Sequence, residues 1–223
     1  MKKNAFLSKA DMVFILLILQ GSITLQFKDY FAKRRRCMFP LFQTRRFYIR
    51  PYEHSDAAAV WEVVSQKRIY DTTYAIPHPY PRGRVDWWFR FLKNSAKHGT
   101  GFEFGIFSKT NGAYIGNIGL INISPENRRA EICYFINPSC WNAGCATECL
   151  EAILRYGFDM LKLKRISGRC MSENRASFRV MEKCGFVYEG TARCEILKDG
   201  VFRNIDHLSI LDTDYYARAG STV

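Results

Sequence analysis

A stretch near the middle of the chain joins a continuous apolar run to a helical periodicity. Residues 132–136 are apolar or aromatic without interruption, which predicts a strand buried on both faces, and Pro138 ends it. After Gly144, apolar residues recur at steps of three and four with charged residues between them, which predicts one helix with one buried face. These apolar positions are Ala146, Cys149, Leu150, Ile153, Leu154, Gly157, Phe158 and Leu161.

The flanking sequence predicts further strands and helices in an α/β arrangement. Ser55 or Asp56 can cap a helix over residues 57–64, a second helix carries Val85 to Leu92, and a third covers residues 174–183. With the central strand at 130–136, the expected strands number seven. The other six cover residues 47–51, 102–107, 114–123, 164–170, 187–197 and 202–211.

The turn between the central strand and its helix predicts an anion site. The first N–H groups of a helix have no partner inside it, and the helix dipole places roughly half a positive charge there. Gly144 can take the positive φ that such a turn needs, and Ala143 and Ala146 leave room for a ligand. A phosphate is the expected guest, although neither of the two common phosphate-loop patterns is present in the chain.

The sequence Trp141-x-x-Gly144-x-Ala146 resembles the pyrophosphate loop of the GNAT acetyltransferases. The usual first residue of that loop is Arg or Gln, and the aromatic residue here is similar to the RimJ/RimL-like branch, the ribosomal-protein-alanine N-acetyltransferase type. A second motif, Asn174-x-x-Ser177 with the Lys-x-Gly-Phe pattern at 183–186, also resembles this family. The resemblance covers about residues 39–213.

This resemblance implies a GNAT fold, a mixed and mostly antiparallel seven-stranded sheet with helices on both faces. A splayed pair of strands, 131–136 and 164–170, would hold acetyl-CoA as co-substrate. Backbone groups of Phe135, Ile136 and Asn137 would bind the pantetheine and the thioester carbonyl. The backbone N–H groups expected to hold the pyrophosphate belong to Asn142, Ala143, Gly144, Cys145, Ala146 and Thr147.

The implied reaction is attack of an amine on the thioester, which needs a proton donor for the leaving thiolate. Many relatives use a tyrosine seven residues after the helix-opening asparagine, but position 181 is Met. We expect Ser177 to take this role, directly or through a water, or else to bond within the first turn of its own helix. Asn174 would fix the geometry around the co-substrate, with helix capping as the structural alternative.

Two glutamates are candidates for the general base. Glu131 matches an acidic position of the RimJ/RimL-like strand, and Glu195 lies on a strand opposite Ser177, although strand alternation can point it away. The need for a base depends on the acceptor. An α-amine with a pKa near 7.7 to 8.0 is roughly a tenth neutral at pH 7, whereas a lysine amine near 10.4 is almost fully protonated.

Composition limits the alternatives. The formal charge of +12 divides into +6 on residues 1–37 and +6 on the remainder, and a ligand rich in phosphate needs positive surroundings as much as nucleic acid does, so no nucleic-acid partner is expected. The eight cysteines contain no C-x-x-C pair and the four histidines no paired spacing, so no metal is expected. Free thiols packed as small apolar groups agree with a cytoplasmic protein.

The ends of the chain lie outside the family-like sequence. Residues 1–37 form an N-terminal extension whose apolar run at 12–19 is too short to cross a bilayer, and we hypothesise that translation of the native protein starts at Met38. Residues 38–214 form the acetyltransferase domain and 215–223 a C-terminal tail. A membrane-anchored protein, an exported protein and a catalytically silent acyl-CoA-binding or nucleic-acid-binding protein remain alternatives.

The acceptor is left open. A Pro-rich, aromatic segment at 70–81 with His78 is expected to form one wall of an apolar acceptor pocket. A protein N-terminus, a free amino acid, a polyamine or a drug would each supply a primary amine. The protein is expected to be a monomer or a homodimer.

Overall fold

The structure of the protein is a computed structural model that describes residues 41–220. The extension at 1–37, the apolar run at 12–19 and the start at Met38 lie outside the described residues. Between residues 41 and 220, no helix is both long enough and apolar enough to span a bilayer.

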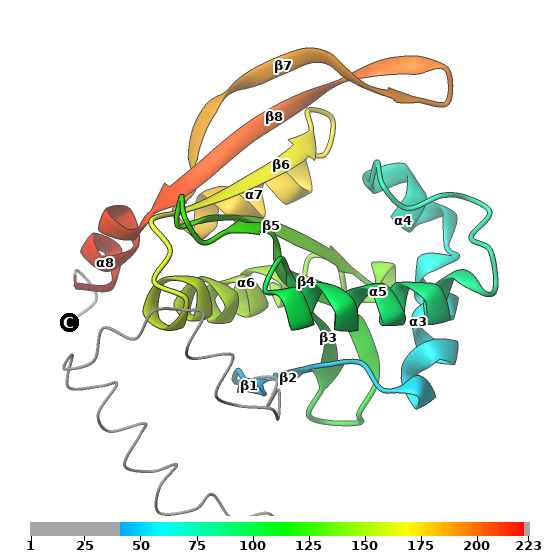
Figure 1. The fold of residues 1–223 in the computed structure, drawn as a ribbon. Helices are drawn as coiled ribbons and strands as arrows, with labels where there is room; N and C mark the ends of the chain where they lie inside the picture. The colour runs from blue at the N-terminus through cyan, green and yellow to red at the C-terminus, as the bar shows by residue number, and fades with distance from the viewer. Residues whose placement is uncertain (1–40, 221–223) are drawn as a thin grey trace, which may run out of the picture. The chain divides into compact units, whose positions relative to one another are not determined.

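One mixed sheet forms the centre of the described domain (Figure 1). Its eight strands run in the order β1-β2-β3-β4-β5-β6-β8-β7, and all neighbours are antiparallel except β5 and β6. The seven predicted strands are present, and the two-residue β1 extends the sheet at one edge. The strands are β1 (Phe42–Gln43), β2 (Phe47–Arg50), β3 (Phe102–Ser108), β4 (Tyr114–Ser124), β5 (Arg129–Ile136), β6 (Arg165–Met171), β7 (Val187–Lys198) and β8 (Val201–Leu211).

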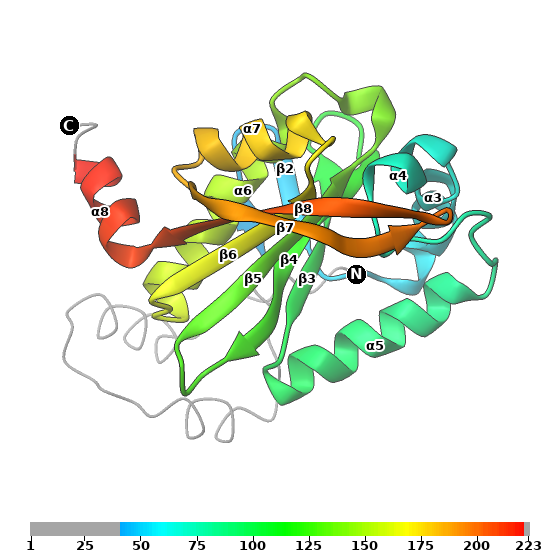
Figure 2. The ribbon, with the colours of Figure 1, turned by 90° about the horizontal axis from the view of Figure 1, so that it is seen from above.

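Helices cover both faces of the sheet, with α5 on one side and α6 and α7 on the other (Figure 2). The helices on the first side are η1 (His54–Asp56), α3 (Ala57–Val64), α4 (Lys67–Thr72) and α5 (Arg84–His98). The helices on the second side are η2 (Pro138–Cys140), α6 (Cys145–Arg155), the π-helical η3 (Tyr156–Met160) and α7 (Arg175–Lys183). The periodicity that predicts one helix to Leu161 therefore corresponds to α6 and η3 together.

The core consists of two hydrophobic clusters. Leu150, Ile153 and Leu154 of α6 are fully buried with Met181 of α7 against one face of the sheet. On the other face, a second cluster joins α3 and α5 to the sheet through residues that include Val60, Phe89 and Phe135. Because Phe135 belongs to the second cluster and its neighbour Ile136 to the first, β5 is buried on both sides, as its uninterrupted apolar run predicts.

Strands β5 and β6 pair over a short distance only. Their register couples Arg129 with Arg165, Ala130 with Ile166 and Glu131 with Ser167, and no later pair is formed between the described strands. From residue 132 onward β5 stays bonded to β4 while β6 stays bonded to β8. The two parallel strands therefore diverge after Glu131, which is the splay that the sequence resemblance implies.

The C-terminal segment differs from the expected tail. Residues Asp212–Gly220 form helix α8, which follows β8 directly. The Tyr215 ring lies 5.0 Å from the Phe158 ring, and the Arg218 guanidinium bonds to Glu151 of α6 at 2.6 Å. An aromatic contact and an ion pair to distant helices attach this short segment to the domain, and neither is visible as a periodicity in its sequence.

Candidate active site

The predicted phosphate loop is an exposed turn that opens α6. Gly144 is the N-cap of α6 with φ 71°, a left-handed conformation that costs an L-residue about 1 kcal/mol or more. A Cβ added at Gly144 would meet only the Arg46 Nη2 at 3.6 Å, so backbone conformation rather than space requires glycine here. No side chain of the described residues caps α6, which leaves its first N–H groups directed at the loop.

Arg46, the residue before β2, holds this loop in place. Its Nη1 donates to the Ala143 carbonyl at 2.8 Å, and its Nε lies 2.6 Å from the Glu148 carboxylate in the first turn of α6. Burial raises the pKa of Glu148, but hydrogen bonds from Thr44 and Arg46 outweigh it and the net pKa is lowered. The Arg46 guanidinium thus lies beside the predicted pyrophosphate position, where Glu148 balances its charge.

Of the six predicted pyrophosphate ligands, only Cys145 has a buried side chain. Asn142, Ala143 and Gly144 are exposed, and Ala146 and Thr147 are half-buried. Asn142 also has a positive φ of 59°, so the turn contains two left-handed residues on either side of Ala143. Backbone N–H groups rather than side chains are what this turn offers to an anion.

The end of β5 is less available than predicted. The Asn137 N–H donates to the Ile115 carbonyl at 2.7 Å, and the Trp141 indole donates to the Ile136 carbonyl at 2.6 Å. The expectation that the Ile136 and Asn137 backbone is free for pantetheine is wrong for these two groups, because Trp141 folds back onto the strand and β4 continues to pair. The unpaired edge of β5 begins after Glu131, and from there to Ile136 it measures about 17 Å, close to the length of an extended pantetheine arm.

Ser177 and Asn174 lie at the start of α7. The Ser177 hydroxyl is 2.8 Å from the Tyr134 phenol oxygen. Burial raises the pKa of Tyr134 above its ordinary value, so the phenol stays protonated. Asn174 caps the helix by accepting the Ser177 N–H at 3.1 Å, and its amide donates to the Thr72 carbonyl at 2.9 Å. These two protein partners account for Asn174 as a structural residue.

The two predicted bases share one cation. Arg169 of β6 lies 2.9 Å from Glu131 through Nε and 3.2 Å from Glu195 through Nη1. The second oxygen of Glu195 is 2.7 Å from His207 Nε2. The bulges of β7 between Ala192 and Ile196 bring Glu195 to this face, where plain alternation leaves its direction undecided.

The loop at 73–83 begins beside Glu131, Arg169 and Glu195. Arg169 lies 5.7 Å from the Tyr74 ring, and Lys198 at the tip of the β7–β8 hairpin donates to the Thr73 carbonyl at 2.6 Å. Burial raises the pKa of Tyr74, against the lowering effect of Arg169. Tyr74, from the 70–81 segment predicted to form an acceptor wall, thus lies near Glu131, Arg169 and Glu195.

Three further polar residues of this region escape sequence analysis: Tyr134, Arg169 and Glu103. Tyr134 reads as one member of an apolar strand, and Arg169 as one of many basic residues. Their partners lie 43 and 38 positions away, so the packing of α7 brings Ser177 to Tyr134 and the β5–β6 register brings Glu131 to Arg169. Tyr134 and Glu131 are three residues apart and lie on opposite faces of β5, as strand alternation predicts.

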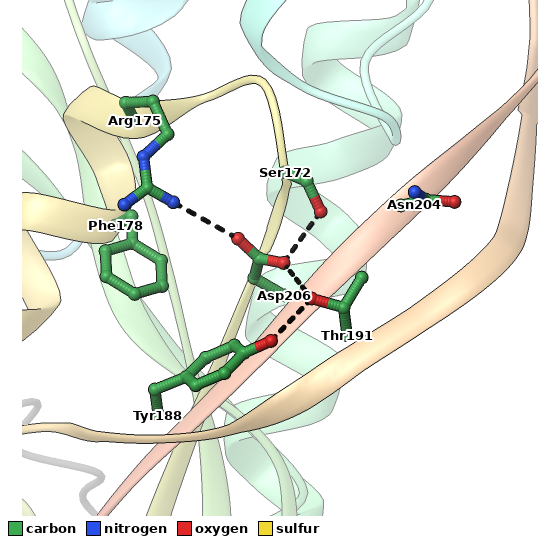
Figure 3. A pocket seen from close by; sticks show the side chains of 7 residues that line it. All are labelled: Ser172, Arg175, Phe178, Tyr188, Thr191, Asn204 and Asp206. Carbon is green, nitrogen blue, oxygen red and sulfur yellow. Dashed lines mark hydrogen bonds and ion pairs between the residues drawn. The ribbon is translucent and has the colours of Figure 1, made fainter.

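A pocket of about 450 Å³ lies between the start of α7 and the β7–β8 hairpin (Figure 3). Asp206 at its floor accepts hydrogen bonds from Ser172 at 2.7 Å and Thr191 at 2.6 Å, and Arg175 lies 3.5 Å away. None of the predicted site residues lines this pocket. Over the described residues no group of three His, Cys, Asp or Glu side chains is placed to hold a metal ion.

Residues 46–187, more than half of the chain, match the model of the acetyltransferase (GNAT) domain. The chain therefore belongs to the GNAT acetyltransferases and is an acyltransferase. YjcK of Bacillus subtilis (strain 168), whose name includes the words "N-acetyltransferase", is 30% identical over 184 residues, which are 78% of this chain and 98% of YjcK. A GNAT-family acetyltransferase structure from Bacillus anthracis superposes with a TM-score of 0.68 and 27% identity, covering 78% of this chain and 99% of that one.

Two shorter similarities carry acceptor names. YdaF of Bacillus subtilis (strain 168), whose name includes "ribosomal N-acetyltransferase", is 30% identical over 52% of this chain and 62% of its own length. The spermidine N(1)-acetyltransferase of Escherichia coli (strain K12) is 30% identical over 48% of this chain and 57% of its own length. The two names give different acceptors, so these similarities identify the family and not the acceptor amine.

Proposed function

We propose that this protein transfers the acetyl group of acetyl-CoA to a primary amine. The observation that supports this most is the divergence of β5 from β6 after Glu131. Helix α6 begins nearby at Gly144, which has a left-handed conformation and no side chain to cap the helix. The described residues fit acetyl-CoA, because the amides of 142–147 would hold the diphosphate and the open edge of β5 would receive the pantetheine. Acetyl-CoA supplies the activated acetyl group, and the chain supplies binding and proton transfer.

The two faces of the sheet carry different chemistry where β5 and β6 diverge. Tyr134 and Ser177 lie on the α7 side, whereas Glu131 and Arg169 lie on the side of the 73–83 loop. A proton donor for the leaving thiolate and the groups that receive the amine are thus separated by the sheet itself. Ser177 would donate a proton to the sulfur and regain one through Tyr134.

The N-terminal α-amine of a protein, such as a ribosomal protein, is the acceptor we favour, in line with the RimJ/RimL-like motifs and the similarity to YdaF. Its pKa near 7.7 to 8.0 leaves roughly a tenth of it neutral at pH 7, so little base strength is required. A small amine such as spermidine is the alternative, supported by the similarity to a spermidine acetyltransferase. We place the reaction in the cytoplasm, where acetyl-CoA is made.

An amine panel tests this function. Full-length protein with acetyl-CoA is assayed for thiol release with an Ala-terminated peptide, a Ser-terminated peptide, free alanine and spermidine. We expect turnover with at least one of them, and a loss of about 100-fold in kcat for Ser177→Ala. Ser95→Ala on α5 is the matched control and keeps wild-type turnover.

Acetyl-CoA binding without turnover of any amine would support a silent acyl-CoA-binding protein instead. Wild-type kcat in Ser177→Ala would remove Ser177 from the mechanism while leaving the transfer reaction in place. Absence of both binding and turnover would contradict the proposal as a whole.

A further inference from the structure

The side chain of Glu103 in β3 extends across the neighbouring strand β4. Its partner in the register is Gly119 of β4, and a Cβ added at Gly119 would lie 2.8 Å from the Glu103 Cγ. The absence of a side chain at 119 therefore leaves the space that the Glu103 side chain fills. Gly119 in turn pairs with Cys133 of β5, so the glutamate reaches toward the strand that borders the splay.

A neutral donor holds the Glu103 carboxylate. The Asn117 amide donates to its Oε2 at 2.8 Å, and the nearby Cys133 thiol also acts to lower the pKa of Glu103. Asn117 is only 2% exposed, and its own oxygen accepts the Tyr52 hydroxyl at 2.8 Å, which fixes the direction of the amide. Tyr52 and Tyr114 are 3.1 Å apart, so the network continues into the core below α5.

No cation accompanies this carboxylate. Glu131 and Glu195 share Arg169, whereas across residues 41–220 no Lys, Arg or His forms an ion pair with Glu103. Burial raises the pKa of Glu103 above its ordinary value, and the neighbouring Asn117 amide and Cys133 thiol only partly oppose this. A carboxylate in a poorly solvated site without a counter-ion is a stronger base than one bound to a guanidinium.

Glu103 also lies on the correct face. Cys133 is two residues beyond Glu131 on β5 and two before Phe135, so all three point to the side covered by α5 and the 73–83 loop. Cys133 and Glu103 are half-buried rather than fully enclosed. The carboxylate therefore lies on the face of the sheet from which an acceptor would approach the divergence of β5 and β6.

We propose that Glu103 is a catalytic base that accepts a proton from the acceptor ammonium, while Arg169 holds Glu131 and Glu195 as an electrostatic frame around the amine. This rests on the proposed acetyltransferase function. The ammonium gives one proton to Glu103, and the neutral nitrogen forms a bond to the thioester carbon as the carbon–sulfur bond breaks. Ser177 donates a proton to the coenzyme A sulfur and regains one from solvent through Tyr134, while the nitrogen's second proton and the proton on Glu103 pass to solvent.

Glu103→Gln tests this role, because glutamine keeps the size of the side chain and cannot take up the proton. We expect kcat/KM for the amine that the panel selects to fall at least 100-fold, with calorimetric affinity for acetyl-CoA unchanged. The acid limb of the kcat/KM profile should move in Glu103→Asp and disappear in Glu103→Gln. The titratable groups facing Glu103 are Cys133, Tyr52 and Tyr114, so Cys133→Ala is included to separate the thiol from the carboxyl.

Glu126→Gln, an exposed glutamate in the β4–β5 turn, is the control and should behave as wild type. Near-wild-type kcat/KM with an unchanged pH profile in Glu103→Gln would overturn the proposal even if acetyl transfer itself is confirmed. A readout independent of turnover is the carbon NMR titration of the Glu103 carboxyl, assigned by its loss in Glu103→Gln. A midpoint at or below that of an ordinary glutamate would also overturn it.

Discussion

The phenol oxygen of Tyr134 lies 2.8 Å from the hydroxyl of Ser177, and it joins the strand that borders the splay to the first turn of α7. Met181 stands where the family resemblance predicts a tyrosine, and it is 1% exposed and belongs to the core. A tyrosine is thus present beside the predicted proton donor, but it comes from β5 rather than from the helix.

Tyr134→Phe removes the hydroxyl while the ring keeps its packing. We expect kcat to fall by about 10- to 100-fold, because Ser177 loses the group that restores its proton. Affinity for acetyl-CoA, measured by calorimetry, should not change. Tyr48→Phe on β2, where the side chain is exposed, is the control, and a Tyr134→Phe enzyme as fast as this control would exclude the relay.

Two substitutions at Asn174 distinguish a role in helix capping from a role in cofactor binding. Asn174→Ala removes the α7 cap and should lower the free energy of unfolding by about 1 kcal/mol, measured by urea denaturation. Asn174→Asp keeps a good cap and loses only the donor to Thr72, so most of the stability should return. If either variant weakens acetyl-CoA binding more than tenfold, the residue contacts the co-substrate as the sequence resemblance implies.

Arg169→Gln leaves Glu131 and Glu195 without their shared cation. The site becomes more negative, so a dication should gain relative to a monocation. We expect the ratio of kcat/KM for spermidine to that for an Ala-terminated peptide to rise several-fold at low salt and less at high salt. Arg165→Gln, on the same face of β6 but paired with Glu189, should leave the ratio unchanged, and an equal rise there would point to general surface charge.

The Arg165–Glu189 pair predicts a pH effect on stability. The hydrogen bond from Arg165 lowers the pKa of Glu189 from 4.5 to about 2. Because the folded state has the lower pKa, the pair stabilises the fold above about pH 4.5, and this contribution is lost as pH falls toward 2. Both side chains are more than a third exposed, so screening keeps the effect below about 1 kcal/mol.

Calorimetric melting of Glu189→Gln checks this. The variant should melt below wild type at pH 7 and at the same temperature near pH 2. A difference in melting temperature that persists at pH 2 would assign the effect to packing rather than to charge.

Local pattern predicts much of this fold. The uninterrupted run of β5 and the three-to-four spacing of α6 identify the two central elements, and the glycine before the helix identifies the left-handed turn at 144. The contacts that the pattern misses depend on how separate elements pair and pack. Glu103 meets Cys133 only because Gly119 lies between them in three paired strands, and Tyr134 meets Ser177 only because α7 packs beside β5.

The end of β5 shows the opposite error. A general expectation for splayed strands predicts free backbone groups at Ile136 and Asn137, but the indole of Trp141 and the carbonyl of Ile115 occupy them. The residue that departs from the usual Arg or Gln of the phosphate loop is thus the residue that changes the strand end. Short polar segments such as α8 also escape prediction, because a few side-chain contacts fix them rather than a periodic face.

We expect the backbone amides at the start of α6 to bind the diphosphate of coenzyme A. Isothermal titration calorimetry of the full chain with coenzyme A, dephospho-coenzyme A and pantetheine tests it most directly. We predict that both diphosphate-containing ligands bind at least about 100-fold more tightly than pantetheine, a difference of roughly 2.7 kcal/mol. Pantetheine binding as tightly as coenzyme A, or no binding of coenzyme A at all, would contradict the account.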